Sequence, residues 1–287
     1  METKLRNHTI DTTKFPSFEP DGEEQISKDE YKARIKKALH QYTTRPILAM
    51  MDACVSCGLC AQACHYYRST EESDLIPAIK CKRLTSILGK HFSPIRSRIR
   101  KSSSVLSDEE IQVLFDASFR NCTLCGKCAL SCPMGINSGE ILSLARTVLN
   151  AIGKAPAGLV SPVVESCRKG NYIGLSGEDF VENIEWITEE MIDEFELDDL
   201  SIPIDKPEAD ILYVPHPLEV RDLPFLLMYA LLTLEASGVN YTLSSEHFDT
   251  VNYAYYQGSK DNMMRIARRM IETNSSAIFK IVFQSSM

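Results

Sequence analysis

The sequence lacks any hydrophobic run long enough to cross a bilayer. Its longest apolar stretch, LPFLLMYALLTL at residues 223–234, is shorter than the roughly 20 residues that a transmembrane helix needs. We therefore expect a buried helix there, and membrane contact only through a partner on the inner face of the membrane. The chain also opens without the charged, apolar and small-residue regions of an export signal, which predicts a cytoplasmic, reducing compartment.

Several common chemistries are also missing from the sequence. It contains no phosphate-binding loop, Rossmann glycine fingerprint, hydrolase triad or flavin motif, which argues against NAD or FAD chemistry. Basic residues are fewer than acidic ones: the sequence has 31 Lys and Arg and 39 Asp and Glu, which gives a net charge of −8. That balance argues against general binding of nucleic acids.

Cysteine, by contrast, is abundant, and most of it falls into two copies of C-x2-C-x2-C-x3-C, namely CVSCGLCAQAC and CTLCGKCALSC. This run holds a [4Fe–4S] cluster, and in two-cluster proteins its fourth cysteine binds the other cluster. The pattern therefore predicts two clusters. Cluster I takes Cys54, Cys57, Cys60 and Cys132, and cluster II takes Cys122, Cys125, Cys128 and Cys64.

Other interpretations of the cysteines fit less well. A zinc site usually has two C-x2-C pairs separated by roughly 12 to 20 residues, and a disulfide framework needs an oxidising compartment. A protein that uses metal only for folding remains an alternative. The two remaining cysteines, Cys81 and Cys167, stand alone and are expected to be small core residues.

Residues beside the cysteines suggest how a cluster would be enclosed and tuned. Gly58 and Gly126 would let each loop fold over a cluster and direct backbone N–H groups at sulfur. Lys127 and His65 would either raise a potential through positive charge or be solvated side chains. His216 would either bind a ligand at a sheet edge or be an ordinary turn residue.

The first half of the sequence is predicted to be helical. We expect an N-terminal arm and helix at 1–44, the helix covering 23–43, and then a helical two-cluster domain at 45–150. Within that domain the periodicity and capping signals predict helices at 77–89, 107–119 and 138–150. Segment 80–101 carries basic residues and no acid, and would either steer an acidic redox partner or form a solvated face.

The second half of the sequence has a different pattern of predicted elements. Residues 151–207 are predicted to be a connector, rich in Gly, Pro and Ser up to 177, followed by an acidic amphipathic helix at 178–200. Residues 208–287 then alternate between strands at 211–214, 239–243 and 277–283 and helices at 223–237 and 262–273. This βαβαβ order predicts a partial, Rossmann-like α/β domain with a parallel sheet.

The two cysteine motifs, set far apart among helices, resemble the α-helical ferredoxin module of C-type and D-type heterodisulfide reductase proteins, of the related K-type protein of sulfite-reduction complexes, and of succinate dehydrogenase iron–sulfur proteins. The segment ADILYVPHPLEVRDLPFLLMYALLTLEASGVNYTLSS resembles the start of the cysteine-rich CCG domain that follows this module in D-type proteins. The resemblance implies a mainly α N-terminal domain followed by a partial CCG-like α/β domain.

The sequence departs from that family in one respect, because no Cys-Cys-Gly motif is present. The resemblance therefore implies electron transfer and not disulfide reduction by this chain alone. We expect an electron-transfer subunit of an oxidoreductase complex, whose partners are a flavoprotein, a haem membrane subunit or a catalytic subunit with CCG motifs. The alternative is a truncated D-type reductase that lacks its catalytic half.

Overall fold

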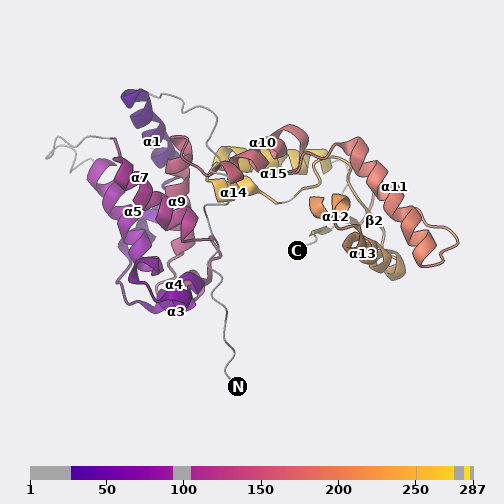
Figure 1. Cartoon of the computed structure of the whole chain (residues 1–287), viewed down its shortest axis with the longest axis horizontal. Coiled ribbons are helices and arrows are strands. Elements are labelled where there is room, and N and C mark those ends of the chain that lie inside the picture. Colours follow the sequence, from indigo (N-terminus) through magenta and orange to yellow (C-terminus); the bar gives the residue numbers. More distant parts are fainter. Residues whose placement is uncertain (1–26, 93–104, 250, 275–280, 285–287) are drawn as a thin grey trace, which may run out of the picture.

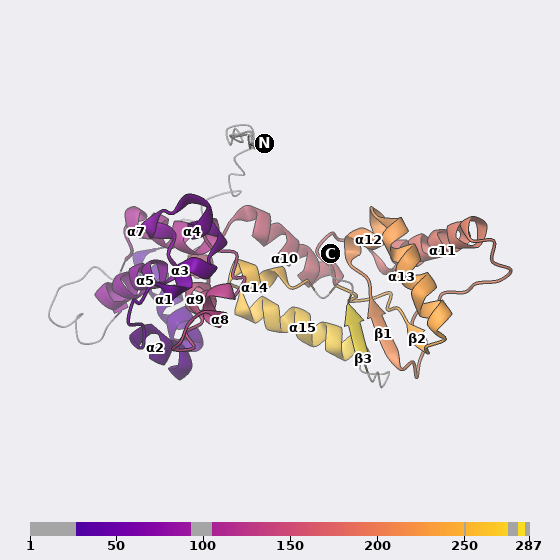
Figure 2. The same ribbon diagram turned by 90° about the horizontal axis from the view of Figure 1, so that it is seen from below.

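The computed structural model describes residues 27–92, 105–249, 251–274 and 281–284. The expected N-terminal arm and the distal part of the basic segment, from residue 93 on, lie outside these ranges. The described chain is elongated and mostly helical (Figure 1). A helical half forms one end, a small sheet with its helices forms the other, and α10 (Ala157–Lys169), α14 (Tyr253–Gln257) and α15 (Lys260–Asn274) lie between them (Figure 2).

The helical half runs from residue 28 to residue 151. Its elements are α1 (Lys28–Tyr42), α2 (Arg45–Asp52), α3 (Leu59–Ala63), α4 (His65–Thr70), the 3-10 turn η2 (Ser73–Leu75), α5 (Pro77–Phe92), α7 (Asp108–Phe115), the π-helical turn η3 (Asp116–Arg120), α8 (Lys127–Leu130) and α9 (Ser138–Ala151). The helices predicted at 23–43, 77–89, 107–119 and 138–150 are confirmed, with shifted ends.

Helix α9 is the centre of this half. Nearly all of its residues are buried, and it contacts α1, α2, α5, α7 and α8. The Asn137 side chain caps its first turn by accepting a hydrogen bond from the backbone N–H of Glu140 at 3.2 Å. A helix that is buried on all sides fixes the positions of its neighbours, and the cysteine loops are attached to those neighbours.

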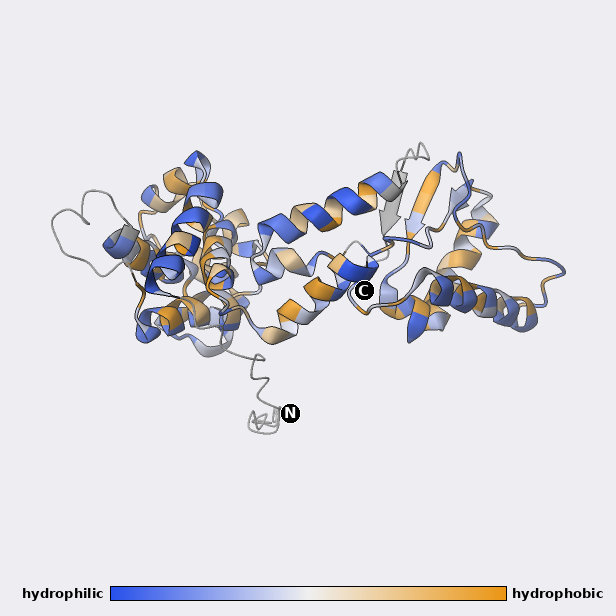
Figure 3. Ribbon diagram, turned by 90° about the horizontal axis from the view of Figure 1, so that it is seen from above, coloured by the Kyte–Doolittle hydropathy of each residue, from blue (hydrophilic) through white to orange (hydrophobic). Residues whose placement is uncertain are grey.

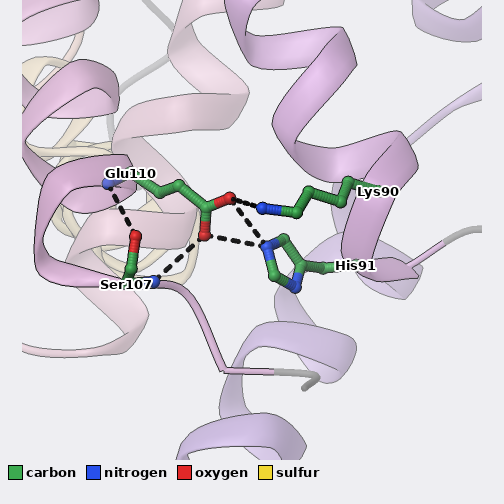
Figure 4. Close-up of polar contacts among 4 residues, drawn as sticks. All are labelled: Lys90, His91, Ser107 and Glu110. Atoms are coloured by element: carbon green, nitrogen blue, oxygen red, sulfur yellow. Dashed lines mark hydrogen bonds and ion pairs between the residues drawn. The ribbon is translucent and has the colours of Figure 1, made fainter. Parts of the chain in front are cut away.

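The start of α7 shows the predicted capping box. The Ser107 side chain accepts from the Glu110 N–H at 3.2 Å, and the Glu110 carboxylate accepts from the Ser107 N–H at 3.0 Å. The same carboxylate accepts hydrogen bonds from Lys90 at 2.6 Å and from His91 at 2.8 Å (Figure 4). Helix α5, which continues beyond Gly89, is thereby tied to α7.

The prediction of a connector at 151–177 is wrong, because this segment contains α10 (Ala157–Lys169). Pro156 immediately precedes the helix, and Gly170, with φ of +82°, ends it in the left-handed region. Proline near a helix start and glycine after its end are helix signals as well as loop signals. Burial of Val163 against α14 (Tyr253–Gln257) and α15 (Lys260–Asn274) favours the helix here.

The acidic helix forms as α11 (Gly177–Glu194), shorter at its C-terminal end than predicted. Its apolar stripe is buried as expected from the sequence, and consists of Phe180, Ile184, Ile187 and Met191. These side chains pack against α13 (Pro224–Ser237) and the strand β1 (Ile211–Val214) in the second hydrophobic core. The short helix α12 (Pro217–Arg221), which the sequence did not predict, follows β1 in the chain and contacts α11 and α13.

The three strands form one parallel sheet in the order β2–β1–β3. β2 (Tyr241–Thr242) and β3 (Ile281–Gln284) flank β1, and Ile211 pairs with Tyr241 on one side and Ile281 on the other. Hydrophobic residues follow one another along β1, whereas α15 is largely hydrophilic (Figure 3). β2 is shorter than predicted, and assignment of this unit as a partial Rossmann-like domain stays a prediction.

No helix within the described ranges combines the length and the hydropathy that a bilayer span requires.

Gly258 allows α14 to approach α9 closely. It has φ of +93°, and a Cβ atom there would lie 2.5 Å from the backbone carbonyl carbon of Arg146. We predict that Gly258→Ala costs about 2 kcal/mol more stability than Gly238→Ala, because overpacking adds to left-handed strain. Gly238 is a matched control, since it also ends a helix at positive φ but has nothing within 4 Å of its Cβ position. Urea denaturation measures both, and equal losses would contradict the prediction.

Glu110 makes stability depend on pH. Burial raises the pKa of Glu110, but hydrogen bonds from Lys90, His91 and Ser107 lower it by a larger amount, so that the resulting pKa is about 2. Because the folded pKa lies below the unfolded value, the stabilisation is complete at neutral pH and is lost as the pH falls below about 4.5 towards 2. We expect Glu110→Gln to cost about 1 kcal/mol at pH 7, allowing for solvent screening.

The exposed neighbour Glu109 provides the control for this test. Urea denaturation of Glu110→Gln and Glu109→Gln between pH 7 and pH 4 should show a lower free energy of unfolding, relative to the unmodified protein, for the first variant only. This difference should begin to decrease near pH 4. A deficit of Glu110→Gln that grew with acidification would contradict the assignment.

Candidate metal centre

The two cysteine loops have the same backbone conformation. Ser56 and Leu124 occupy equivalent positions with φ of +58° and +59°, and Gly58 and Gly126 follow with φ of +82° and +73°. A short helix, α3 or α8, begins directly after each glycine. Two left-handed residues turn each loop back on itself, which brings its first three cysteines around one hollow. The glycines therefore have the conformational role that the sequence suggested, whereas the strained Ser56 and Leu124 were not anticipated.

Each loop surrounds a separate hollow in the protein. Hollow I is lined by Cys54, Cys57, Cys60 and Cys132, together with apolar side chains that include Met50, Ile136 and Ile141. Hollow II is lined by Cys122, Cys125, Cys128 and Cys64, together with Tyr66, Lys80 and Leu142. The structure thus brings three cysteines of one loop together with the fourth cysteine of the other, while the role of these residues as ligands stays a prediction.

The donor set suits iron–sulfur clusters. All eight cysteines are free thiols, and thiolate is the usual ligand of [4Fe–4S] clusters. The backbone N–H of Leu124 lies 3.4 Å from Cys122 Sγ, so it can donate to that sulfur. Within the described ranges, no three His, Cys, Asp or Glu side chains converge to hold a single metal ion. The thiols instead surround hollows, as a cluster that binds each thiolate through a different iron requires.

Exposure differs among the cysteines. Cys57 and Cys125, the second cysteine of each loop, are exposed, whereas Cys64 is buried. Burial raises the pKa of the Cys122 thiol, and the positive charges of Lys80 and Arg146 act in the opposite direction. Each set of four therefore has one cysteine at the protein surface, and in hollow II the fourth cysteine, Cys64, is shielded from water.

The two isolated cysteines are not part of either set of four. Cys81 is buried, and its Sγ lies 3.8 Å from the carbonyl oxygen of Ser138. Burial raises its pKa to about 12, so the thiol is protonated at neutral pH although it borders hollow I. Cys167 packs at the edge of the small core between α10, α14 and α15. Both positions agree with the expected core role.

Two buried cations lie near hollow II. Lys80 is 2% exposed, and its ammonium donates to the Asn121 carbonyl at 2.7 Å. Arg146 on α9 donates to the carbonyl oxygens of Ser118 at 2.8 Å, Cys122 at 2.5 Å and Tyr256 at 2.7 Å. Arg146 thus links the second cysteine loop to α14.

No sequence pattern pointed to Arg146, and Lys80 belongs to the basic segment that was expected to face solvent or an acidic partner. That expectation is wrong for Lys80. Elsewhere in the segment, Arg83 pairs with Asp74 at 2.7 Å and Lys90 pairs with Glu110 at 2.6 Å. The available signal for Lys80 was its helical spacing from the buried Leu84 and Leu88.

The other residues singled out in the sequence have simpler positions. Lys127 and His65 border hollow II with exposed side chains. His216 lies far along the chain at the start of α12, where its Nδ1 accepts from the Leu218 N–H at 3.3 Å. It is a helix cap in this structure, in keeping with a turn residue.

Comparison with known proteins agrees with an iron–sulfur interpretation of the cysteine loops. Residues 50–136 match a family described as a 4Fe-4S dicluster domain, so the chain is a [4Fe–4S] iron–sulfur protein. No solved structure gives a significant match.

Individual relatives show more specifically which iron–sulfur proteins this chain is similar to. The Hdr-like menaquinol oxidoreductase iron-sulfur subunit of Archaeoglobus profundus is 30% identical over 196 residues, 68% of this chain and 34% of the relative. Its Archaeoglobus fulgidus counterpart, the second iron-sulfur subunit, is 31% identical over 172 residues, 59% of this chain and 31% of the relative. The D-type component of the dihydromethanophenazine:CoB–CoM heterodisulfide reductase of Methanosarcina barkeri is 33% identical over 112 residues, 39% of this chain and 27% of the relative.

These matches confirm the predicted resemblance: the chain is a heterodisulfide-reductase-like iron–sulfur protein. It spans about a third of the length of the Archaeoglobus relatives.

Proposed function

We propose that this chain relays single electrons through two [4Fe–4S] clusters, accepting them from a reduced redox protein and passing them to an oxidised one. The observation that carries the proposal is the position of Ser138, the first residue of α9, which lines both hollows. Two clusters separated by so little protein would exchange electrons readily. The contact between α3 and α8, which follow the two glycines, supports the same proximity.

We assign the ligands by hollow. Cys54, Cys57, Cys60 and Cys132 would hold cluster I, and Cys122, Cys125, Cys128 and Cys64 would hold cluster II. A bound [4Fe–4S] cluster supplies one-electron chemistry with little rearrangement of its ligands. The chain's own residues would shield the sulfurs from water, orient an N–H towards Cys122, and leave an edge accessible at Cys57 and Cys125.

The proposed setting is a heterodisulfide-reductase-like complex. Partner subunits would supply the groups that donate or finally accept electrons, such as a flavin, a haem or a substrate-reducing cluster. The sheet β2–β1–β3 with α13 and α15 would be the start of a CCG-type domain, as its parallel order and its place after the dicluster domain suggest. Arg146 would couple that region to the second cysteine loop through its bond to the Tyr256 carbonyl.

Paired cysteine variants test the crossed ligand sets. We predict that Cys57→Ala and Cys132→Ala, from different loops, remove the same EPR signal, and that Cys125→Ala and Cys64→Ala remove the other. Each variant should retain about four of about eight irons per chain. Cys167→Ala is the control, because Cys167 borders neither hollow, and it should retain all the iron.

Uncrossed ligation would group the variants differently, with Cys132→Ala losing the same signal as Cys125→Ala. That result would contradict the ligand assignment. Unchanged iron in all four variants would contradict the assignment of these cysteines as cluster ligands.

A further inference from the structure

Lys80 is a buried cation whose counter-charge is not supplied by a carboxylate. Its ammonium lies 2.7 Å from the Asn121 carbonyl oxygen, 4.0 Å from Cys64 Sγ and 5.8 Å from the centre of the Tyr66 ring. These are a carbonyl, a thiol and an aromatic ring, and no salt bridge to Lys80 occurs among the described residues. A buried ammonium is costly unless an anion or several hydrogen bonds offset it.

A negatively charged group in hollow II would supply the missing charge. Four thiolates around an iron–sulfur core carry net negative charge, and one-electron reduction adds one more. Because Lys80 is buried, its attraction for that added charge is weakly screened by water. The position of Lys80 therefore favours the reduced state of whatever cluster Cys64 binds.

Hollow I has no equivalent of Lys80 among the residues that the structure describes. The lysine that lines it, Lys82, lies two residues further along α5 and is exposed, so water and salt screen its charge. Hollow II also has the exposed Lys127 and His65, and the buried Arg146 bonds to the Cys122 carbonyl beside it. No Asp or Glu is among the described residues that line either hollow.

We propose that Lys80 makes cluster II the higher-potential of the two clusters, so that a single electron shared between them resides mainly at hollow II. The proposal rests on the proposed two-cluster function and adds to it an order of potentials and the residue that sets it. Lys80 acts here as a tuning residue that contacts a ligand, and its charge, not its shape, is what matters.

EPR-monitored redox titration of the anaerobically purified full chain tests this. Lys80→Met removes the charge and keeps the length, Lys80→Arg keeps the charge, and Lys82→Met removes the exposed lysine of hollow I. In Lys80→Met the reduction equilibrium constant of the cluster with the higher midpoint potential should fall at least tenfold. For one electron this lowers that midpoint potential by at least about 59 mV. The lower midpoint potential of Lys80→Met should shift by less than this amount from its value in the unmodified protein. Both midpoint potentials of Lys80→Arg and of Lys82→Met should also shift by less than this amount.

Iron content is measured first, so that two failures can be told apart. Fewer than about eight irons in the unmodified protein would overturn the proposed function. Full iron with no shift in Lys80→Met, or a shift of the lower potential instead, would overturn only the role of Lys80. If Lys80→Met loses iron, Lys80→Gln takes its place, because its amide can still donate to the Asn121 carbonyl.

Discussion

The exchange of one cysteine between the two loops is the constraint on which the helical half depends. Cys64 follows the first loop but faces hollow II, and Cys132 follows the second loop but faces hollow I. The loops must therefore lie against each other, and the described helices of the insert between them have to pack around that contact. Helix α9 meets this demand by being buried almost throughout, with its first residue between the hollows and Arg146 in its second half.

The same arrangement separates the charges around the two hollows. Lys80 and Lys82 are two positions apart on α5, and a helix turns such neighbours to different faces. One lysine is therefore buried beside Cys64 while the other reaches solvent at hollow I. A local feature of helix geometry thus makes two nearly identical cysteine loops electrostatically different.

The sequence predicted those features that depend on neighbouring residues. The cysteine spacing, the glycine in each loop, the Ser107 capping box and the apolar stripe of α11 are all local patterns. The features it did not predict depend on distant contacts. Helix α10 is stabilised by packing on α14 and α15, and Lys80 is buried because Asn121 and Tyr66 approach it from other segments. The short helices α12 and α14 are likewise too brief for periodicity to reveal.

The measurement that tests the central claim most directly is the iron and acid-labile sulfide content of anaerobically purified protein, combined with EPR after dithionite reduction. The account predicts about eight irons and eight sulfides per chain, with signals broadened by spin–spin interaction between two adjacent clusters. Four or fewer irons per chain, or stoichiometric zinc, would contradict it.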